Sequence, residues 1–327
     1  MYKRHANEPY EDYFVRLFEH KSEYGLTCQQ IADLLNAQNG NAFGECAYRK
    51  EYSAFNRGRM YERAQAERGV AARILCVSDL HVPFQLPVET FHDYAGGVVD
   101  TLVINGDVED CQSVSAFQKK YRVNFIEEMI AARQYLLDLI EYIKPRTVCI
   151  TRGNHEDRLL RYLTDRINDD LLQLMPDSPL DLIINSGFHN YDRKTEVDVF
   201  YRPLRQVLDG QVELIYDGNW HCKVGHTIFA HPLTYSSAML KTTEKAVNFF
   251  LREDRDFDSI VLAHTHKLGQ YVQGGIAMYE QGCCCQVEKM NYADGKLTLP
   301  QQKGFIVIAQ DKDGHILHDH TKLVQLT

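Results

Sequence analysis

The chain lacks the cysteine spacing and the long apolar runs of disulfide-bonded, zinc-knuckle or membrane-spanning proteins. Its 327 residues include nine cysteines, an odd number, and no Cys-x-x-Cys pair. We therefore expect reduced thiols and no disulfide framework. No run approaches the roughly 18 apolar residues of a membrane helix, and the charged start, Met1 to Tyr10, has no apolar core. These absences favour a soluble, cytoplasmic protein that is not exported.

The chain also lacks an excess of basic residues. The formal net charge is −9, which argues against a surface that coats nucleic acid throughout, although a local basic face remains compatible with it. An acidic total also suits a site built from carboxylates. With 44% apolar residues the chain can bury a full core. We expect one large domain with an accessory segment.

From residue 73 onward, short apolar runs alternate with helical patterns, which is typical of α/β proteins. The predicted strands share an apolar body followed directly by polar residues, and they span 73–78, 101–105, 147–151, 227–230 and 259–263. Polar side chains that follow successive strands gather at one edge of an α/β sheet, where ligands bind. Runs at 276–279 and 304–310 are predicted to complete a second sheet.

Helical spacing connects these strands at two places. Residues 125–143 repeat apolar side chains at helical intervals until Pro145, and 238–252 show the same pattern. The stretch 164–220 mixes Pro, Asp and Gly, and we interpret it as an insertion or cap of the domain that spans 71–327.

Residues 1–70 show helical spacing with no convincing strand, and we predict an accessory domain of three helices there. Thr27 and Gln30 form a capping box at the start of the second helix, and the third begins near Glu45. The arrangement resembles a helix-turn-helix unit. Residues 45–73 contain seven Lys or Arg against four Glu, a local charge of +3. The predicted DNA contacts are the basic side chains Arg49, Lys50, Arg57 and Arg59. A helical bundle that packs on the enzyme or forms a dimer is the alternative.

Side chains of metal-ligand type follow all five predicted strands. They are Asp79, His81, Asp107, Asn154, His231, His264 and His266. Carboxylate, imidazole and amide ligands together favour manganese, with iron, zinc or nickel as alternatives. Seven ligands exceed what one centre uses with a position open for water, and Asp107 has two oxygens with which to bridge a pair. We therefore predict two divalent ions, which suit phosphoryl displacement.

The motifs Asp-x-His, Gly-Asp-x-x-Asp, Gly-Asn-His-Glu, a single His and a closing His-x-His resemble those of calcineurin-like metallophosphoesterases. The resemblance covers about 73–327 and implies a two-sheet αββα sandwich, here preceded by a small all-α domain. It also implies the assignment of the ions. Asp79, His81 and His266 would hold one ion. Asn154, His231 and His264 would hold the other, with Asp107 as the bridge.

The same resemblance implies that His155 faces the substrate phosphate as a proton donor, and that Asp110 orients its imidazole. The closing motif usually reads Gly-His-x-His, whereas this chain has Ala263, which places the turn before His264 in question.

Other residues near these motifs have two interpretations each. Arg152, Arg158 and Arg161 flank the Asn154–His155 segment, and we predict contacts to phosphate oxygens, with a solvated helix face as the alternative. For the three adjacent cysteines at 283–285 we predict packing, because neighbouring strand residues point to opposite faces.

The function predicted from these features is a phosphodiesterase or nuclease that acts on DNA. Chains that pair such a helical unit with this domain resemble phage and prophage metallophosphoesterases. A phosphatase or diesterase of small nucleotides or phosphoproteins is the alternative, and oligomerisation is compatible with either. The Arg-Gly pair of Ser/Thr protein phosphatases does not follow residues 106–110. A DNA-binding regulator with an inactive enzyme fold is disfavoured by the intact ligand set. No membrane partner is expected.

Overall fold

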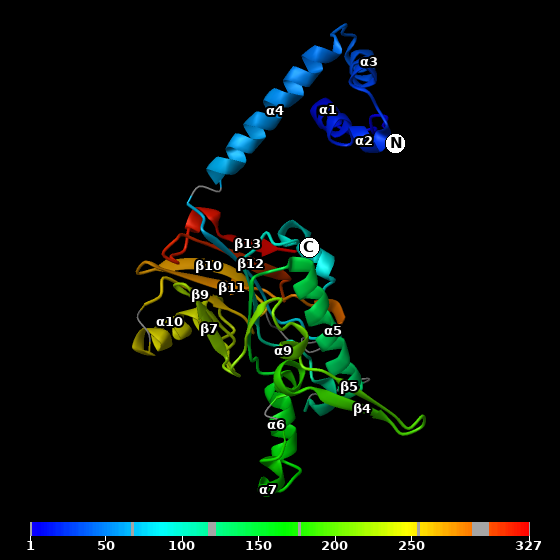
Figure 1. Cartoon of the computed structure of the whole chain (residues 1–327). Coiled ribbons are helices and arrows are strands. Elements are labelled where there is room, and N and C mark those ends of the chain that lie inside the picture. The colour runs from blue at the N-terminus through cyan, green and yellow to red at the C-terminus, as the bar shows by residue number, and fades with distance from the viewer. Residues whose placement is uncertain are drawn as a thin grey trace. The chain divides into compact units, whose positions relative to one another are not determined.

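The protein is described by a computed structural model that covers residues 2–66, 69–116, 122–175, 178–253, 256–289 and 301–326 (Figure 1). The chain divides into two compact units, Met1–Arg68 and Gly69–Thr327. Within the described residues, no helix combines the length and the apolar character needed to cross a membrane.

The first unit is helical, as expected. It contains α1 (Tyr10–Glu19), α2 (Lys21–Tyr24), α3 (Cys28–Asn39) and α4 (Glu45–Ala66). The predicted capping box is confirmed, because the Thr27 hydroxyl accepts from the Gln30 amide while the Gln30 side chain accepts from Thr27. The short α2 was not predicted. The core of this unit consists of the buried side chains Tyr13, Phe14, Leu17, Ile31, Ala32, Leu35 and Tyr48.

The second unit contains a six-stranded sheet. Its order is β13 (Lys322–Gln325), β12 (Gly304–Gln310), β1 (Ala72–Val77), β2 (Thr101–Asn105), β3 (Thr147–Thr151) and β6 (Glu213–Ile215). β1, β2, β3 and β6 run parallel, and β12 lies antiparallel to β1. The expectation that 304–310 belongs to the second sheet is therefore wrong. Every residue of β12 is buried, which suits a strand covered on both faces.

A second sheet of five strands follows the order β10 (Leu268–Gln273), β11 (Ile276–Gln281), β9 (Ser259–Leu262), β8 (Thr227–Ala230) and β7 (His221–Val224). β8, β9 and β11 are parallel, and the two edge strands are antiparallel to their neighbours. The five strands that precede the candidate ligands thus belong to two sheets, which corrects the expectation of a single sheet edge.

The two sheets pack face to face between helices. Along β1, Leu75 and Val77 face a core shared with α5 (Phe125–Ile143), while Ile74 and Cys76 face Phe229 of the second sheet. α10 (Lys241–Glu253) covers the outer face of the second sheet through buried apolar contacts. Figure 1 shows α5 and α10 on opposite sides of the paired sheets. The predicted αββα sandwich is confirmed.

The stretch 164–220 follows α6 (Asp157–Thr164) and contains several short elements. They are α7 (Asp169–Leu172), α8 (Pro179–Asp181), η3 (Leu182–Ser186), β4 (Phe188–Asp192), β5 (Val197–Tyr201) and α9 (Leu204–Val207). Leu180, Ile183 and Leu204 enter the main core, and β6 pairs with β3. These parts belong to the body of the fold, so the insertion is narrower than 164–220. The β4–β5 hairpin extends from it (Figure 1).

Short 3-10 helices complete the described elements. They are η1 (Val88–Tyr94), η2 (Gln112–Val114), η4 (Val287–Lys289) and η6 (His318–His320). Of these, η2 lies between β2 and α5 and contacts α6.

Candidate metal centre

The carboxyl ends of β1, β2, β3, β8 and β9 bring the seven predicted ligands together. The parallel strands of each sheet end at the same edge, so the loops that follow them meet. Across this junction His81 Nε2 lies 3.2 Å from His266 Nε2, and His231 Nε2 lies 3.2 Å from Asn154 Oδ1. Residues 185 positions apart in the chain thus meet in one buried cluster.

The backbone at these strand ends is strained. Asp79, His81, Asp107, His264 and His266 all have left-handed φ angles, between 48° and 73°. Such a conformation costs a non-glycine residue about 1–3 kcal/mol, and it persists where the surrounding fold imposes it. Strain of this kind concentrates at functional sites. In the Asp79-x-His81 and His264-x-His266 segments, this backbone allows both ligand side chains to turn toward the same point.

Ala263 fits the turn before His264. Its amide donates to the Ala230 carbonyl at 3.1 Å, which continues the pairing of β9 with β8. The positive φ of 73° falls on His264 itself. A glycine at 263 is therefore not required for this turn, because the left-handed position lies one residue later.

Two glycines permit the close approach of the loops. A Cβ added at Gly106 would clash with the His231 ring, and one added at Gly153 would overlap the Asp107 carboxylate and amide. Gly106 also has a φ of +77°. Both positions therefore require a residue without a side chain.

Glu156 is a structural residue of this site that our sequence analysis did not assign. Its fully buried carboxylate accepts from the amides of Val108 and Gly153 at 2.7 Å each, and from the amide of Asp107 at 3.1 Å. It thus ties the loop after β2 to the loop after β3. The Gly-Asn-His-Glu motif contained this residue, but spacing alone does not reveal which amides a carboxylate will reach.

The first group of candidate ligands consists of Asp79, His81 and His266. His266 Nε2 lies 3.1 Å from Asp79 Oδ1, and all three side chains are almost fully buried. Burial opposes ionisation of Asp79, but the charge and hydrogen bond of His266 outweigh it and lower the pKa of Asp79. Imidazole nitrogens and a carboxylate oxygen that converge in a buried site fit a bound cation.

The second group consists of Asp107, His231 and His264, whose ligand atoms all lie within 4.8 Å of one another. The His231 ring donates from Nδ1 to the Asn105 carbonyl at 2.8 Å, which turns Nε2 toward Asp107 Oδ2 at 3.4 Å. Burial alone would lower the pKa of His231, but the carboxylates of Asp107 and Asp79 raise it to about 9. Burial and the charge of His231 lower the pKa of His264 to about 4, so the two rings of this group differ in their preference for the proton.

Asp107, a member of the second group, also approaches the first. Its Oδ2 is 3.4 Å from His231 Nε2 and 3.9 Å from His81 Nε2. No other carboxylate among the described residues has both of these contacts. The donor set therefore fits bound divalent cations, and the Asp107 carboxylate approaches both ligand groups.

His155 lies beside both groups. Its Nδ1 is 3.2 Å from Asp110 Oδ1, and Asp110 is completely buried. Arg158 Nη2 lies 2.6 Å from His155 Nε2. A guanidinium can only donate, so His155 Nε2 accepts in this arrangement and Nδ1 carries the proton toward Asp110.

The three arginines predicted to contact phosphate are placed differently. Arg158 contacts His155 and also donates to the Asp110 carbonyl at 2.6 Å. Arg152 Nε pairs with Asp157 Oδ1 at 3.2 Å, and Arg161 Nη2 lies 3.9 Å from Asp157 Oδ2.

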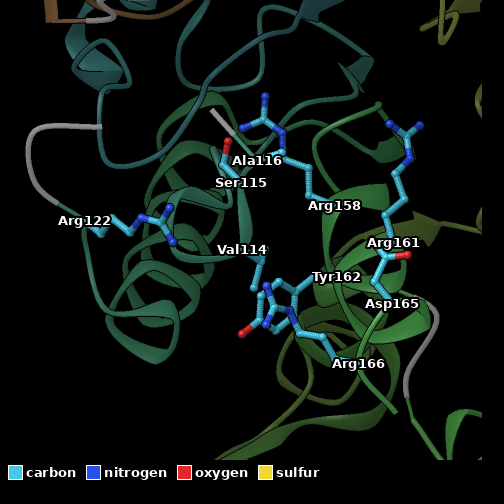
Figure 2. A pocket seen from close by; sticks show the side chains of 9 residues that line it. All are labelled: Val114, Ser115, Ala116, Arg122, Arg158, Arg161, Tyr162, Asp165 and Arg166. Atoms are coloured by element: carbon cyan, nitrogen blue, oxygen red, sulfur yellow. The ribbon is translucent and has the colours of Figure 1, made fainter. Parts of the chain in front are cut away.

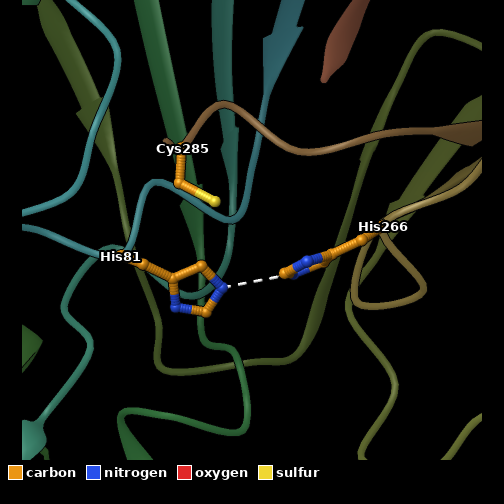
Figure 3. A group of neighbouring side chains, drawn as sticks. All are labelled: His81, His266 and Cys285. Carbon is orange, nitrogen blue, oxygen red and sulfur yellow. Dashed lines mark hydrogen bonds between the residues drawn. The ribbon is translucent and has the colours of Figure 1, made fainter. Parts of the chain in front are cut away.

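Two of the three adjacent cysteines, Cys283 and Cys285, lie on the side of the metal centre. Cys284 packs in the core beside α5, as strand alternation requires, whereas Cys285 points the other way. Figure 3 shows the Cys285 thiol directed toward the space between His81 and His266. Its sulfur lies within 4.8 Å of their ring nitrogens, so packing is not its only available role. The register that decides this could not be derived from the Cys-Cys-Cys run.

The basic residues predicted to contact DNA lie on α4. Arg49 Nε pairs with Glu45 Oε2 at 3.2 Å, and Arg59 Nη1 pairs with Glu19 Oε1 at 2.7 Å. Lys50 and Arg57 are exposed, and Arg57 donates to the Ser53 hydroxyl at 3.0 Å.

The family profile described as calcineurin-like phosphoesterase matches residues 72–268. The chain belongs to this family. The family expected from the motifs is thus confirmed, and the protein is a metal-dependent phosphoester hydrolase of the calcineurin-like type. Calcineurin-like phosphoesterases bind divalent metals, and the buried His and Asp groups agree with this property.

Other comparisons concern smaller regions or the fold. The profile of the YonJ N-terminal domain matches residues 1–67. The SPbeta prophage-derived uncharacterized protein YonJ of Bacillus subtilis (strain 168) is 34% identical over 65 residues, which are 20% of this chain and 16% of that protein. Vps29 of Cryptosporidium parvum shares 15% identity over 79% of this chain and 99% of its own, with a TM-score of 0.37. A novel archaeal phosphodiesterase shares 14% identity over 78% and 99%, with a TM-score of 0.33.

Proposed function

We propose that this calcineurin-like phosphoesterase is a two-metal phosphodiesterase that cleaves DNA. The observation that supports the chemistry is Asp107, whose carboxylate approaches both buried ligand groups. Two bound divalent cations stabilise the charge that develops on the attacking and leaving oxygens of a phosphoryl displacement. The basic α4 supports nucleic acid as the substrate class.

The ligands divide by their neighbours. Asp79, His81 and His266 would hold one ion, and Asn154, His231 and His264 would hold the other; the short distances within each set support this division. Manganese best suits this mixed set of carboxylate, imidazole and amide donors, and the nearby Cys285 sulfur keeps zinc or iron as alternatives.

His155 gives a proton to the leaving oxygen only from its doubly protonated form, in which Nδ1–H stays with Asp110 and Nε2 has taken up a proton from solvent. In the present arrangement Arg158 occupies Nε2. When a phosphate enters, Arg158 exchanges this contact for the phosphate oxygens, which offer a stronger, charge-assisted acceptor.

The DNA role of α4 is tested in the full chain with the double substitution Lys50→Ala and Arg57→Ala. We expect weaker binding of single- and double-stranded DNA and a shallower dependence of log Kd on log salt, by about one unit per lost phosphate contact. Hydrolysis of bis-p-nitrophenyl phosphate is the reference reaction, because that small diester needs the centre alone. The double substitution Lys194→Ala and Lys312→Ala removes the same charge from the second unit and serves as the matched control.

If the Lys50/Arg57 double variant binds DNA with the same affinity and the same salt slope as the Lys194/Lys312 control, a docking role for α4 is contradicted. The alternative would then be favoured: an enzyme for small nucleotides or phosphoproteins, with helices that pack or dimerise. The ion pairs of Arg49 and Arg59 inside the helical unit are the observation that favours it. A change in sedimentation behaviour without a change in DNA binding would identify dimerisation.

A further inference from the structure

An open cavity of about 380 Å³ lies between the η2 segment and α6. Four arginines line it, and among the lining residues Asp165 is the only acid, so its local charge is +3 in a chain of net charge −9. The arginines are Arg122, Arg158, Arg161 and Arg166. Figure 2 shows Arg122 on one side of the cavity and the other three on the side of α6.

The spacing of these arginines disfavours a purely structural explanation. Arg158 and Arg161 are three residues apart on α6, where like charges share a face and destabilise a helix by a few tenths of a kcal/mol. Arg158 lies 3.6 Å from the buried Asp110 carboxylate, but acidic compensation of Arg161 is weak, since it lies 3.9 Å from Asp157 and its side chain is 63% exposed. Arg122 bonds to the Ser113 carbonyl, and the Arg166 guanidinium lies 4.2 Å above the Tyr162 ring. An anionic ligand would compensate this charge.

The cavity adjoins the candidate centre through Arg158. This side chain lines the cavity while its guanidinium contacts His155 Nε2 and the Asp110 carbonyl. A ligand in the cavity therefore lies beside the residue assigned to the leaving oxygen. The volume falls within the range of about 300–1,000 Å³ of small-ligand pockets, which is enough for a nucleotide-sized group.

We propose that this cavity binds a second phosphate of the substrate, one nucleotide away from the phosphodiester that is cleaved. The inference rests on the proposed phosphodiesterase function and narrows its substrate class to esters that carry a further phosphate. Arg122 and Arg166 are the side chains that would recognise the second phosphate without affecting the centre, because neither contacts His155 or the ligand groups in the described structure. The second phosphate belongs either to a longer nucleic-acid strand or to a terminally phosphorylated nucleotide.

The test compares small diesters that differ by one phosphate. The reference is TpT, with a single phosphodiester, and the probes are pTpT and TpTp, with a terminal phosphate, and TpTpT, with a second internal one. We expect at least one probe to have a KM about tenfold below that of TpT, the worth of one or two charge-assisted hydrogen bonds. Arg122→Gln and Arg166→Gln should each reduce this KM ratio toward one, whereas Lys312→Ala should preserve it.

The possible results distinguish failure of the cavity assignment from failure of the proposed phosphodiesterase function. Equal KM values for TpT and all three probes in an enzyme that hydrolyses bis-p-nitrophenyl phosphate would overturn the cavity assignment and leave the phosphodiesterase intact. No hydrolysis of any diester would overturn the proposed function. A preference for TpTpT as well as pTpT or TpTp supports a strand as the source, and a preference for terminal phosphates alone supports a nucleotide. A preference that survives both glutamine variants would also overturn the assignment.

Discussion

Asp107→Asn is expected to abolish most turnover and to weaken retention of both cations. The Asp107 carboxylate is the group that approaches both ligand sets, at 3.4 Å from His231 and 3.9 Å from His81. A neutral amide compensates two divalent charges poorly. The loss of metal affinity should therefore exceed the roughly 10–100-fold cost of losing an outer partner of a metal ligand.

The measurement for this variant combines metal content with kcat on bis-p-nitrophenyl phosphate at matched manganese concentrations. Asp138→Asn is the matched control, since Asp138 is an exposed carboxylate on α5 that accepts from Gln134. The control should behave like the native chain. An Asp107→Asn protein that keeps both ions and its turnover would show that this carboxylate is not the bridge.

His155→Asn is expected to retain both ions and to lower kcat by roughly 10²–10⁴, the usual contribution of a positioned proton donor. The asparagine cannot donate a proton to the leaving oxygen as an acid does. Asp110→Asn should lose less, because Asp110 acts through the ring of His155, 3.2 Å away. Metal content and kcat measured on the same preparations separate chemistry from binding.

His189→Asn provides the control for this substitution. His189 lies on the β4–β5 hairpin, exposed and bonded to Asp198, so its loss should leave both quantities unchanged. If His155→Asn empties the metal centre yet keeps its chemistry in excess manganese, the role assigned to His155 is wrong.

Local patterns predicted the main elements of the fold well. The apolar runs at 101–105, 147–151 and 227–230 became β2, β3 and β8 with the predicted bounds, because short β-branched stretches between polar residues leave few alternatives. The helix 125–143 also matches α5. Its start is capped by the Asn124 side chain and it ends before Pro145, so both limits are local signals.

Features that depend on distant pairing could not be predicted in the same way. β12 joins the first sheet beside β1, although more than two hundred residues separate them. β6 has only three residues, too few for an apolar pattern to appear, and it lies inside the predicted insertion. In both cases the neighbouring strand determines to which sheet the segment belongs, and a run of apolar residues does not indicate which strand it will pair with.

The candidate site shows the same division. The ligand types after each strand were visible in the chain, but their convergence from two sheets required the observed strand order. The left-handed backbone at Asp79 and His266, and the amide bonds of Glu156, follow from how the loops meet. The approach of Cys285 depends on register in the same way.

The central claim is a centre that binds two ions per chain, and metal analysis of the reconstituted protein tests it most directly. Protein freed of metal would be titrated separately with manganese, iron, zinc and nickel, and bound metal and turnover would be measured at each step. We predict that turnover rises to its maximum only as the second ion per chain binds, with manganese giving the highest rate. Full turnover at one ion per chain or fewer would contradict the account.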